Sequence, residues 1–168
     1  MSAPSRRAPR GAAVPGGGVL VELERRVRSW SPARRDLVRW ASAALGARAA
    51  GCELGVAVVG AAESARLNAR YRGRTGPTNV LSFAPARLPR AARPRRWQIG
   101  ELVICPPVLA AEARAQAKSL RAHWAHLVVH GALHLAGYDH ARAADARRME
   151  RREVAVLRTL GFADPYRS

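Results

Sequence analysis

The stretch "LRAHWAHLVVHGALHLAGYDH" (residues 120–140) decides how the rest of the chain must pack. Residues 120–137 are apolar on nearly every side of a helix, and a helix that is apolar all round is a buried one. Gly137 is expected to end that helix, because glycine adopts the left-handed conformation after a helix C-terminus with little strain. The sequence therefore predicts a central buried helix that the other elements surround.

The segments upstream and downstream of this helix show strand or helix patterns of their own. Apolar alternation or short apolar runs predict four strands, within residues 16–27, 52–60, 80–85 and 99–107. Helices are predicted over 31–48, with Ser31 as N-cap and Gly46 as the stop, and over 61–73, 108–119 and 142–161. We predict an α+β fold, a small, mainly four-stranded mixed sheet packed with about five helices. Residues 1–17 are predicted to be a flexible basic tail and residues 18–168 a single domain.

The charge of the chain favours a polyanionic partner. Lys and Arg number 29 against 12 Asp and Glu, a formal net charge of +17, which favours nucleic acid. Lys118 is the single lysine among many arginines, a bias that leaves some of these charges as ordinary solvated surface. A membrane partner is not expected, because no apolar run approaches the ~18 residues of a span. Five arginines of the Pro-broken loop 87–96 are predicted to bind RNA: Arg87, Arg90, Arg93, Arg95 and Arg96.

The cysteines and the N-terminus indicate a reducing compartment. Cys52 and Cys105 both lie in apolar, strand-like runs, and no CxxC pair is present. The first residues carry arginines but no apolar core of a secretory signal. We therefore expect buried thiols, no disulfide and a cytoplasmic protein.

Three histidines at the end of the buried helix form a candidate metal site. His130 and His134 are four residues apart, which places their rings on one helix face about 6 Å apart at Cβ. The turn at Gly137 can bring His140 towards the same point. Neutral imidazoles suit zinc, and one Zn²⁺ per chain is the leading prediction, although nickel, copper and cobalt also accept three imidazoles.

Two neighbours of these histidines have other expected roles. His126 shares their helix face, but it lies two turns, about 12 Å, from His134, too far for both to bind one ion. We expect it to pack in the core, support the ligands from the second coordination shell or face the substrate. Asp139 either orients one imidazole through its second ring nitrogen or caps the helix that begins near Arg142.

The ligand count predicts catalysis rather than a purely structural ion. Three protein ligands leave a fourth position open, where zinc can polarise a phosphoryl or carbonyl group and activate water. Zinc peptidases with an HExxH pattern use its glutamate as the general base, and Gly131 stands at that position here. Peptide hydrolysis by that mechanism is therefore only a distant third prediction.

At this point the chain resembles a known family. "HGALHLAGYDH", "LNARYRGRTGPTNVLSF" and "IGELVIC" resemble the YbeY family of bacterial rRNA maturation factors, described as zinc-dependent endoribonucleases, and the likeness runs from about residue 52 to 166. The resemblance implies that His130, His134 and His140 bind zinc and that Arg72 is needed for activity. A guanidinium is always charged and holds phosphate through two hydrogen bonds, which agrees with phosphate positioning by Arg72. The resemblance further implies single-stranded RNA as substrate and work on the small ribosomal subunit, near the 3′ end of its rRNA.

Two departures from the family pattern affect the expected chemistry. Thr75 stands where an acidic residue is frequent, and Gly100–Glu101 stands where "LGD" is usual. Glu101 is the candidate general base, and attack by the RNA 2′-OH is the alternative chemistry. The main rival function is a non-catalytic ribosome-assembly factor that binds rRNA or a ribosomal protein and uses its metal structurally.

Overall fold

The structure is a computed structural model that describes residues 17–85, 92, 96–138 and 141–167. Residues 1–16 of the predicted tail lie outside these ranges, as do Arg87, Arg90, Arg93, Arg95, Asp139 and His140. Four strands, β1 (Leu20–Arg25), β2 (Cys52–Val58), β3 (Val80–Phe83) and β4 (Trp97–Ile104), form one sheet. Five helices accompany it: α1 (Arg34–Leu45), α2 (Ala61–Arg72), α3 (Pro106–Ala115), α4 (Leu120–Leu135) and α5 (Ala143–Thr159). The predicted α+β fold with a four-stranded mixed sheet is confirmed.

The sheet is mixed, in the order β1-β2-β4-β3. β1 pairs parallel with β2, β2 pairs parallel with β4, and the short edge strand β3 runs antiparallel to β4. The register between β2 and β4 shifts between Glu53 and Leu54, so β4 carries an extra residue there. Such a bulge bends a strand and raises its local twist.

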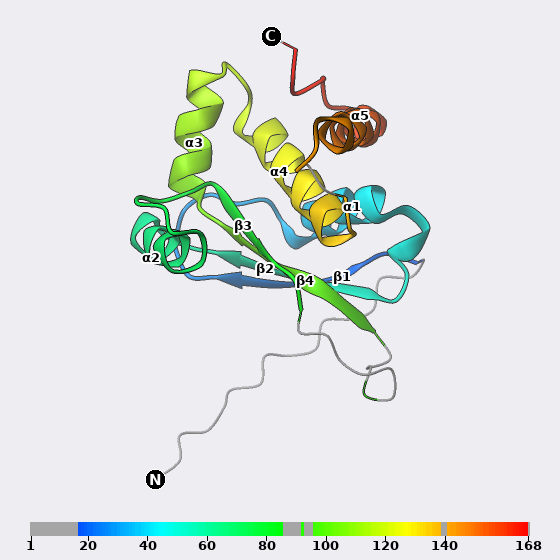
Figure 1. The fold of residues 1–168 in the computed structure, drawn as a ribbon, viewed down its shortest axis with the longest axis horizontal. Helices are drawn as coiled ribbons and strands as arrows, with labels where there is room; N and C mark the ends of the chain where they lie inside the picture. The colour runs from blue at the N-terminus through cyan, green and yellow to red at the C-terminus, as the bar shows by residue number, and fades with distance from the viewer. Residues whose placement is uncertain (1–16, 86–91, 93–95, 139–140, 168) are drawn as a thin grey trace.

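The two faces of the sheet bury different sets of side chains, because successive residues of a strand point to opposite faces. Leu54, Val56, Leu102 and Ile104 join the large core beneath α1, α4 and α5. These three helices lie on one side of the sheet (Figure 1). The alternate positions form a smaller cluster of Ala57, Val59, Leu81 and Val103, against which Leu67 of α2 packs. α2 therefore covers the opposite face.

α4 is the buried helix that the sequence predicts. Ser119 caps it, its Oγ accepting a hydrogen bond from the Ala122 N–H at 3.1 Å. Trp124, Val128 and Leu133 have no exposed surface, and Gly137 follows the helix with φ +101°. Where α4 crosses β4, a Cβ on Gly131 would lie 2.6 Å from Leu102 Cδ2. The helix thus sits directly on the sheet, and this contact fixes where its polar face points.

Two local expectations differ from the structure. Ser31 does not cap α1, which has Ala33 as its N-cap residue. The Ser31 Oγ instead accepts a hydrogen bond from Arg25 Nε at 2.8 Å, so the hydroxyl ties the chain back to β1. The prolines expected only to close the fourth strand begin α3, with Pro106 as its first residue. Proline suits that position because its fixed φ is already helical and its missing N–H needs no partner.

Both cysteines are buried free thiols, as predicted. Cys52 Sγ donates a hydrogen bond to the Arg48 carbonyl at 2.8 Å, and burial raises the pKa of its thiol.

No helix in the described ranges combines the length and apolar character required to cross a lipid bilayer.

Candidate functional site

Histidines follow one another along a single face of α4. The ring centroids of His123 and His126 lie 6.4 Å apart, and those of His126 and His130 lie 6.3 Å apart. His134 is one turn beyond His130. Since Gly131 lies against the sheet on the opposite side, the histidines are left to face α3, α5 and the chain that follows α4. The packing of one helix therefore sets the direction of every imidazole.

His130 is held by a carboxylate of α5. Its Nδ1 lies 2.6 Å from Glu153 Oε1, and Glu153 has no exposed surface. Burial alone would raise the pKa of Glu153, but hydrogen bonds from His126, His130 and Tyr166 outweigh it and lower the pKa to about 2. An ionised carboxylate only accepts hydrogen bonds. Toward an ionised Glu153, His130 donates from Nδ1, and Nε2 of the neutral ring then carries the lone pair.

His134 has the same arrangement with a different acceptor. Its Nδ1 lies 3.2 Å from the carbonyl oxygen of Tyr138, in the turn after α4. A carbonyl oxygen also only accepts, so this geometry again places the proton on Nδ1 and the lone pair on Nε2. Metal-binding histidines commonly have such a partner, which fixes both the tautomer and the ring orientation.

These two histidines fit a zinc ion in donor chemistry and in local support. Both rings come from one helix face, and in both the nitrogen with the lone pair is the one a metal would bind. The third predicted ligand, His140, lies outside the described residues, and so does Asp139. Within the described ranges, accordingly, no group of three or more metal-binding side chains is assembled.

His126 shares the carboxylate of His130. Its Nε2 lies 3.1 Å from Glu153 Oε2, and the Tyr166 hydroxyl donates to the same oxygen. His126 is thus bound to the residue that contacts His130. Three residues before His126, a little under one turn, His123 pairs with Glu112 at 2.7 Å.

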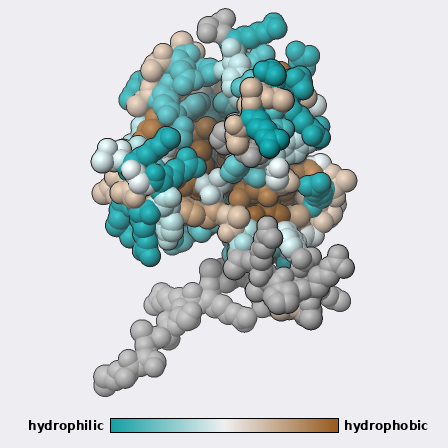
Figure 2. Space-filling view, in the orientation of Figure 1, coloured by the Kyte–Doolittle hydropathy of each residue, from teal (hydrophilic) through white to brown (hydrophobic). Residues whose placement is uncertain are grey.

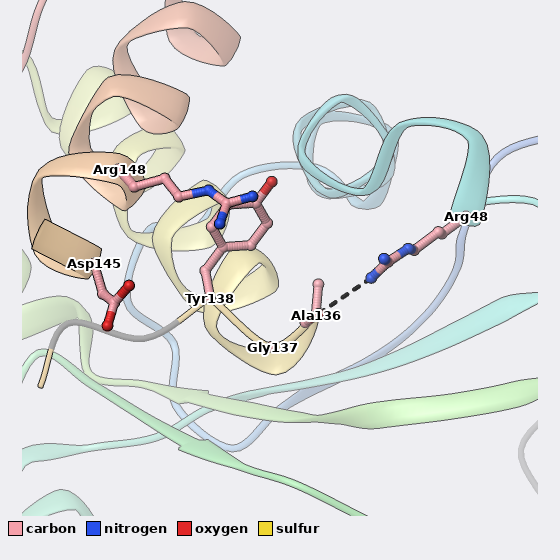
Figure 3. Close-up of a pocket in the computed structure, with 6 residues that line it drawn as sticks. All are labelled: Arg48, Ala136, Gly137, Tyr138, Asp145 and Arg148. Atoms are coloured by element: carbon pink, nitrogen blue, oxygen red, sulfur yellow. Dashed lines mark hydrogen bonds between the residues drawn. The ribbon is translucent and has the colours of Figure 1, made fainter.

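A polar pocket of about 380 Å³ opens beside the turn that follows His134. It is lined by Arg48, Ala136, Gly137, Tyr138, Asp145 and Arg148. The Arg148 guanidinium lies over the Tyr138 ring, 5.9 Å from its centroid, and Arg48 Nη1 donates to the Ala136 carbonyl at 3.2 Å (Figure 3). Two guanidinium groups from different parts of the chain therefore flank the turn that follows His134.

The structure places Glu101 across the sheet from this helix face and Arg72 at the β3 edge of the sheet. Arg72 is the exposed last residue of α2, next to Tyr71, whose ring packs on Phe83 of the edge strand β3. Glu101 shares its face of β4 with Val103, the face that α2 covers, and its Cγ lies above Gly55. The sheet therefore separates Glu101 from α4, while Arg72 borders the sheet at the β3 edge.

Of the arginines predicted to bind nucleic acid, Arg96 is described. It is exposed immediately before β4. Burial of the Glu53 carboxyl and the nearby Glu22 raise the pKa of Glu53, and the positive charge of Arg96 only partly opposes this rise. Figure 2 shows hydrophilic side chains spread over the helices of the visible face.

The sequence reasoning missed Glu153, Tyr166 and Arg48. Glu153 had a usable signal, because it falls among Met149, Val156 and Leu157 on the inward face of α5. A carboxylate at a core position needs partners, since charged residues are almost never fully buried unless paired. Arg48 gave no such signal, because its contact with Ala136 joins residues far apart in the chain.

The fold and the histidine face define a small α+β protein organised around one histidine-rich buried helix. The sequence matches the family described as Endoribonuclease YbeY over residues 24–161. The chain belongs to this YbeY endoribonuclease family.

Relatives agree with this family assignment, and a solved structure shares the fold. Endoribonuclease YbeY of Alkalilimnicola ehrlichii is 51% identical over 142 residues, which cover 83% of this chain and 85% of the relative. The protein of the same name from Methylococcus capsulatus is 49% identical over 148 residues, 86% of this chain and 93% of the relative. The solution structure of TM1509 from Thermotoga maritima has the same fold, with a TM-score of 0.54 and 21% identity, covering 89% of this chain and 99% of that protein.

Proposed function

We propose that this chain is a zinc-dependent endoribonuclease that cuts single-stranded RNA and matures the 3′ end of the small-subunit rRNA in the cytoplasm. One observation carries the proposal: His130 and His134 stand one turn apart with each Nδ1 tied to an oxygen acceptor, in a chain of an endoribonuclease family. In this proposal His140 is the third ligand, one Zn²⁺ binds per chain, and the small ribosomal subunit is the partner.

Bound zinc supplies a Lewis acid for a phosphate oxygen and an activated water. The charge of the ligands and of the whole chain suits an RNA substrate. Imidazole ligands carry no charge, so they do not repel an RNA phosphate, and the net charge of +17 attracts one. Arg72 is proposed to hold the phosphate with its guanidinium, while Arg48 and Arg148 border the approach beside His134.

Gly131 argues against the zinc-peptidase alternative. A glutamate at this position would serve as base only if it pointed at the ion, whereas Gly131 faces Leu102 on the sheet. The second candidate function remains the ribosome-assembly factor with a structural metal. It is favoured by the position of Glu101 across the sheet from α4, which leaves no general base assigned among the described residues.

The test pairs metal content with cleavage of a single-stranded rRNA 3′ fragment, for wild type and His134→Ala. We expect stoichiometric zinc and metal-dependent cutting in the wild type, both lost in a variant that keeps its helical circular dichroism. His123→Gln is the matched control, because His123 shares the helix face but pairs with Glu112. It should keep both properties.

The outcomes separate the two functions. Stoichiometric zinc without cutting, together with loss of the fold on chelation, would favour the assembly factor, because a structural metal stabilises the folded state. The chemical groups at the ends of the RNA products identify the group that attacks the phosphate. A 2′,3′-cyclic phosphate would show attack by the RNA 2′-OH rather than by water.

A further inference from the structure

We propose that Glu153 is a positioning residue of the metal centre, which fixes His130 for metal binding and ties the C-terminal Tyr166 to it. The inference rests on the proposed function, because it assigns a role toward the zinc ion that His130 and His134 would bind. Glu153 is not expected to touch the ion or the RNA. It acts through the imidazole of His130.

The geometry of the carboxylate supports this role, because its two oxygens have separate tasks. Oε1 lies 2.6 Å from His130 Nδ1. Oε2 accepts a hydrogen bond from the Tyr166 hydroxyl and lies 3.1 Å from His126 Nε2. Tyr166 and His126 thereby hold the carboxylate in place while its other oxygen holds His130. A residue on α5 thus orients a side chain of α4 that is expected to bind the metal.

Burial makes these contacts strong and their loss severe. Glu153 has no exposed surface, so no water competes for its oxygens. A buried carboxylate without partners is strongly unfavourable, and three convergent donors satisfy this one. Burial and the hydrogen bond to Glu153 raise the pKa of Tyr166, which keeps the phenol protonated as a donor. A negative charge on Glu153 also makes the His130 imidazole a better electron donor to a cation.

The contact between Tyr166 and Glu153 links the segment after α5 to the support of His130. Tyr166 follows α5 and the turn at Gly161, and its ring packs edge-on against His126 at 5.4 Å. Nearby, Lys118 Nζ donates to the Pro165 carbonyl, which fastens the same segment to the chain before α4. The segment around Pro165 and Tyr166 is therefore part of the support of His130.

The experiment measures zinc affinity by competition with a chromophoric chelator, for wild type, Glu153→Gln and Tyr166→Phe. Glutamine keeps the shape of Glu153 but removes its charge and turns one acceptor into a donor. We expect Glu153→Gln to bind zinc about 10–100-fold more weakly, the usual effect of removing a residue that orients a metal ligand. Tyr166→Phe should lower the affinity by a smaller factor. Unchanged affinity in a folded Glu153→Gln protein would overturn the proposal.

Glu112→Gln is the matched control. Glu112 also pairs with a histidine of α4, at 2.7 Å from His123 Nε2, but His123 is not an expected ligand. The control should bind zinc as tightly as wild type. A merely structural role of Glu153 would lower thermal stability without changing zinc affinity, so melting of the metal-free proteins is recorded in parallel.

A second measurement uses the wild type alone, so it tests the proposal even if Glu153→Gln fails to fold. Correlation spectra of the imidazole ¹⁵N nuclei in the zinc-loaded wild type report which ring nitrogen of His130 carries the proton. The proposal requires the proton on Nδ1 and zinc at Nε2. Zinc at Nδ1 would overturn it.

Failure of this inference is distinguishable from failure of the proposed function. A wild type that binds no zinc overturns both. A wild type that binds zinc and cuts RNA, with full affinity retained in Glu153→Gln, overturns the role of Glu153 and leaves the endoribonuclease proposal standing.

Discussion

At Gly131, α4 comes so close to β4 that an added Cβ would lie 2.6 Å from Leu102 Cδ2 and 3.0 Å from its Cδ1. Leu102 is fully buried and cannot swing into solvent. We expect Gly131→Ala to destabilise the domain. Overpacking typically costs about 1–3 kcal/mol, and the better helix propensity of alanine returns at most about 1 kcal/mol. Urea unfolding would measure the change.

A second substitution tests whether this contact is the cause. Leu102→Val removes the terminal carbons that the new methyl group would meet. In that background Gly131→Ala should be less destabilising than in the wild type, a coupling that a double-mutant cycle isolates. If Gly131→Ala is as stable as the wild type, α4 does not sit as closely on the sheet as the structure shows.

Residue spacing predicts part of the candidate site and misses the rest for a physical reason. His130 and His134 are recognisable because both belong to one helix and their spacing is local. Glu153 could not be matched to His130 by spacing, since the two residues meet only when α5 packs on α4. Its position among inward apolar residues was informative, but it did not name the partner.

Among the elements, α1 and α4 are joined by an ion pair at the surface. Arg121 Nη1 and Nη2 donate to the two oxygens of Asp36 at 3.0 and 2.9 Å. This hydrogen bonding with Arg121 holds the pKa of Asp36 below its usual value. Partly exposed pairs contribute at most about 1 kcal/mol, and we expect Asp36→Asn to lose no more than that at pH 7.

The same ion pair predicts a pH dependence with a definite sign. Because folding lowers the pKa of Asp36, the contribution is complete above the unfolded value of about 3.9 and disappears as pH falls through the lower folded value. The stability difference between wild type and Asp36→Asn should therefore shrink towards zero in acid. A difference that persists at low pH would assign the effect to something other than ionised Asp36. Urea unfolding at several pH values measures it.

Gly100 is where the C-terminal end of α4 meets the sheet. Its φ is +143°, and a Cβ there would collide with the Phe83 carbonyl oxygen and approach Leu135 Cδ2 to 2.7 Å. We expect Gly100→Ala to destabilise the domain by about 2–5 kcal/mol, the sum of backbone strain and overpacking. Gly51→Ala is the control, because Gly51 has φ +91° but no heavy atom within 4 Å of an added Cβ. Gly51→Ala should lose only the stability that backbone strain costs. An equal loss of unfolding free energy in both variants would contradict the close contact at Gly100.

Elements were predictable where local pattern and packing agree. The alternation in β1 predicts a strand there, and the glycine stops of α1 and α2 predict where these helices end, because these signals act within a few residues. Ser31 failed as a cap because a tertiary partner, Arg25, binds its hydroxyl. Local capping rules cannot anticipate a competing partner from another element.

For the whole molecule, the strand order β1-β2-β4-β3 was beyond sequence reasoning, because it depends on pairing between distant segments. The same limit applies to charge. The net charge of +17 predicts an anionic partner but not the face that meets it. Only the fold brings Arg48, from the turn after α1, to the same pocket as Arg148 of α5, beside the turn that follows His134.

This arrangement predicts that the pocket arginines contribute more to RNA binding than other exposed arginines do. We expect Arg48→Gln with Arg148→Gln to weaken binding of a single-stranded RNA and to reduce its dependence on salt. Each lost phosphate contact lowers the slope of log K against log salt by about 0.7 for a single strand. Binding is measured in the His134→Ala background, so that the RNA is not cut.

The control changes the same charge elsewhere. Arg28→Gln with Arg39→Gln removes two exposed arginines that do not line the pocket. Circular dichroism must show that the pocket variant is folded, because Arg48 also bonds the Ala136 carbonyl and Arg148 also covers Tyr138. A larger loss of slope in the pocket variant would place RNA phosphates beside His134. Equal slopes in the two variants would mean that the arginines act only through the overall charge, and that the RNA reaches the histidines from another side.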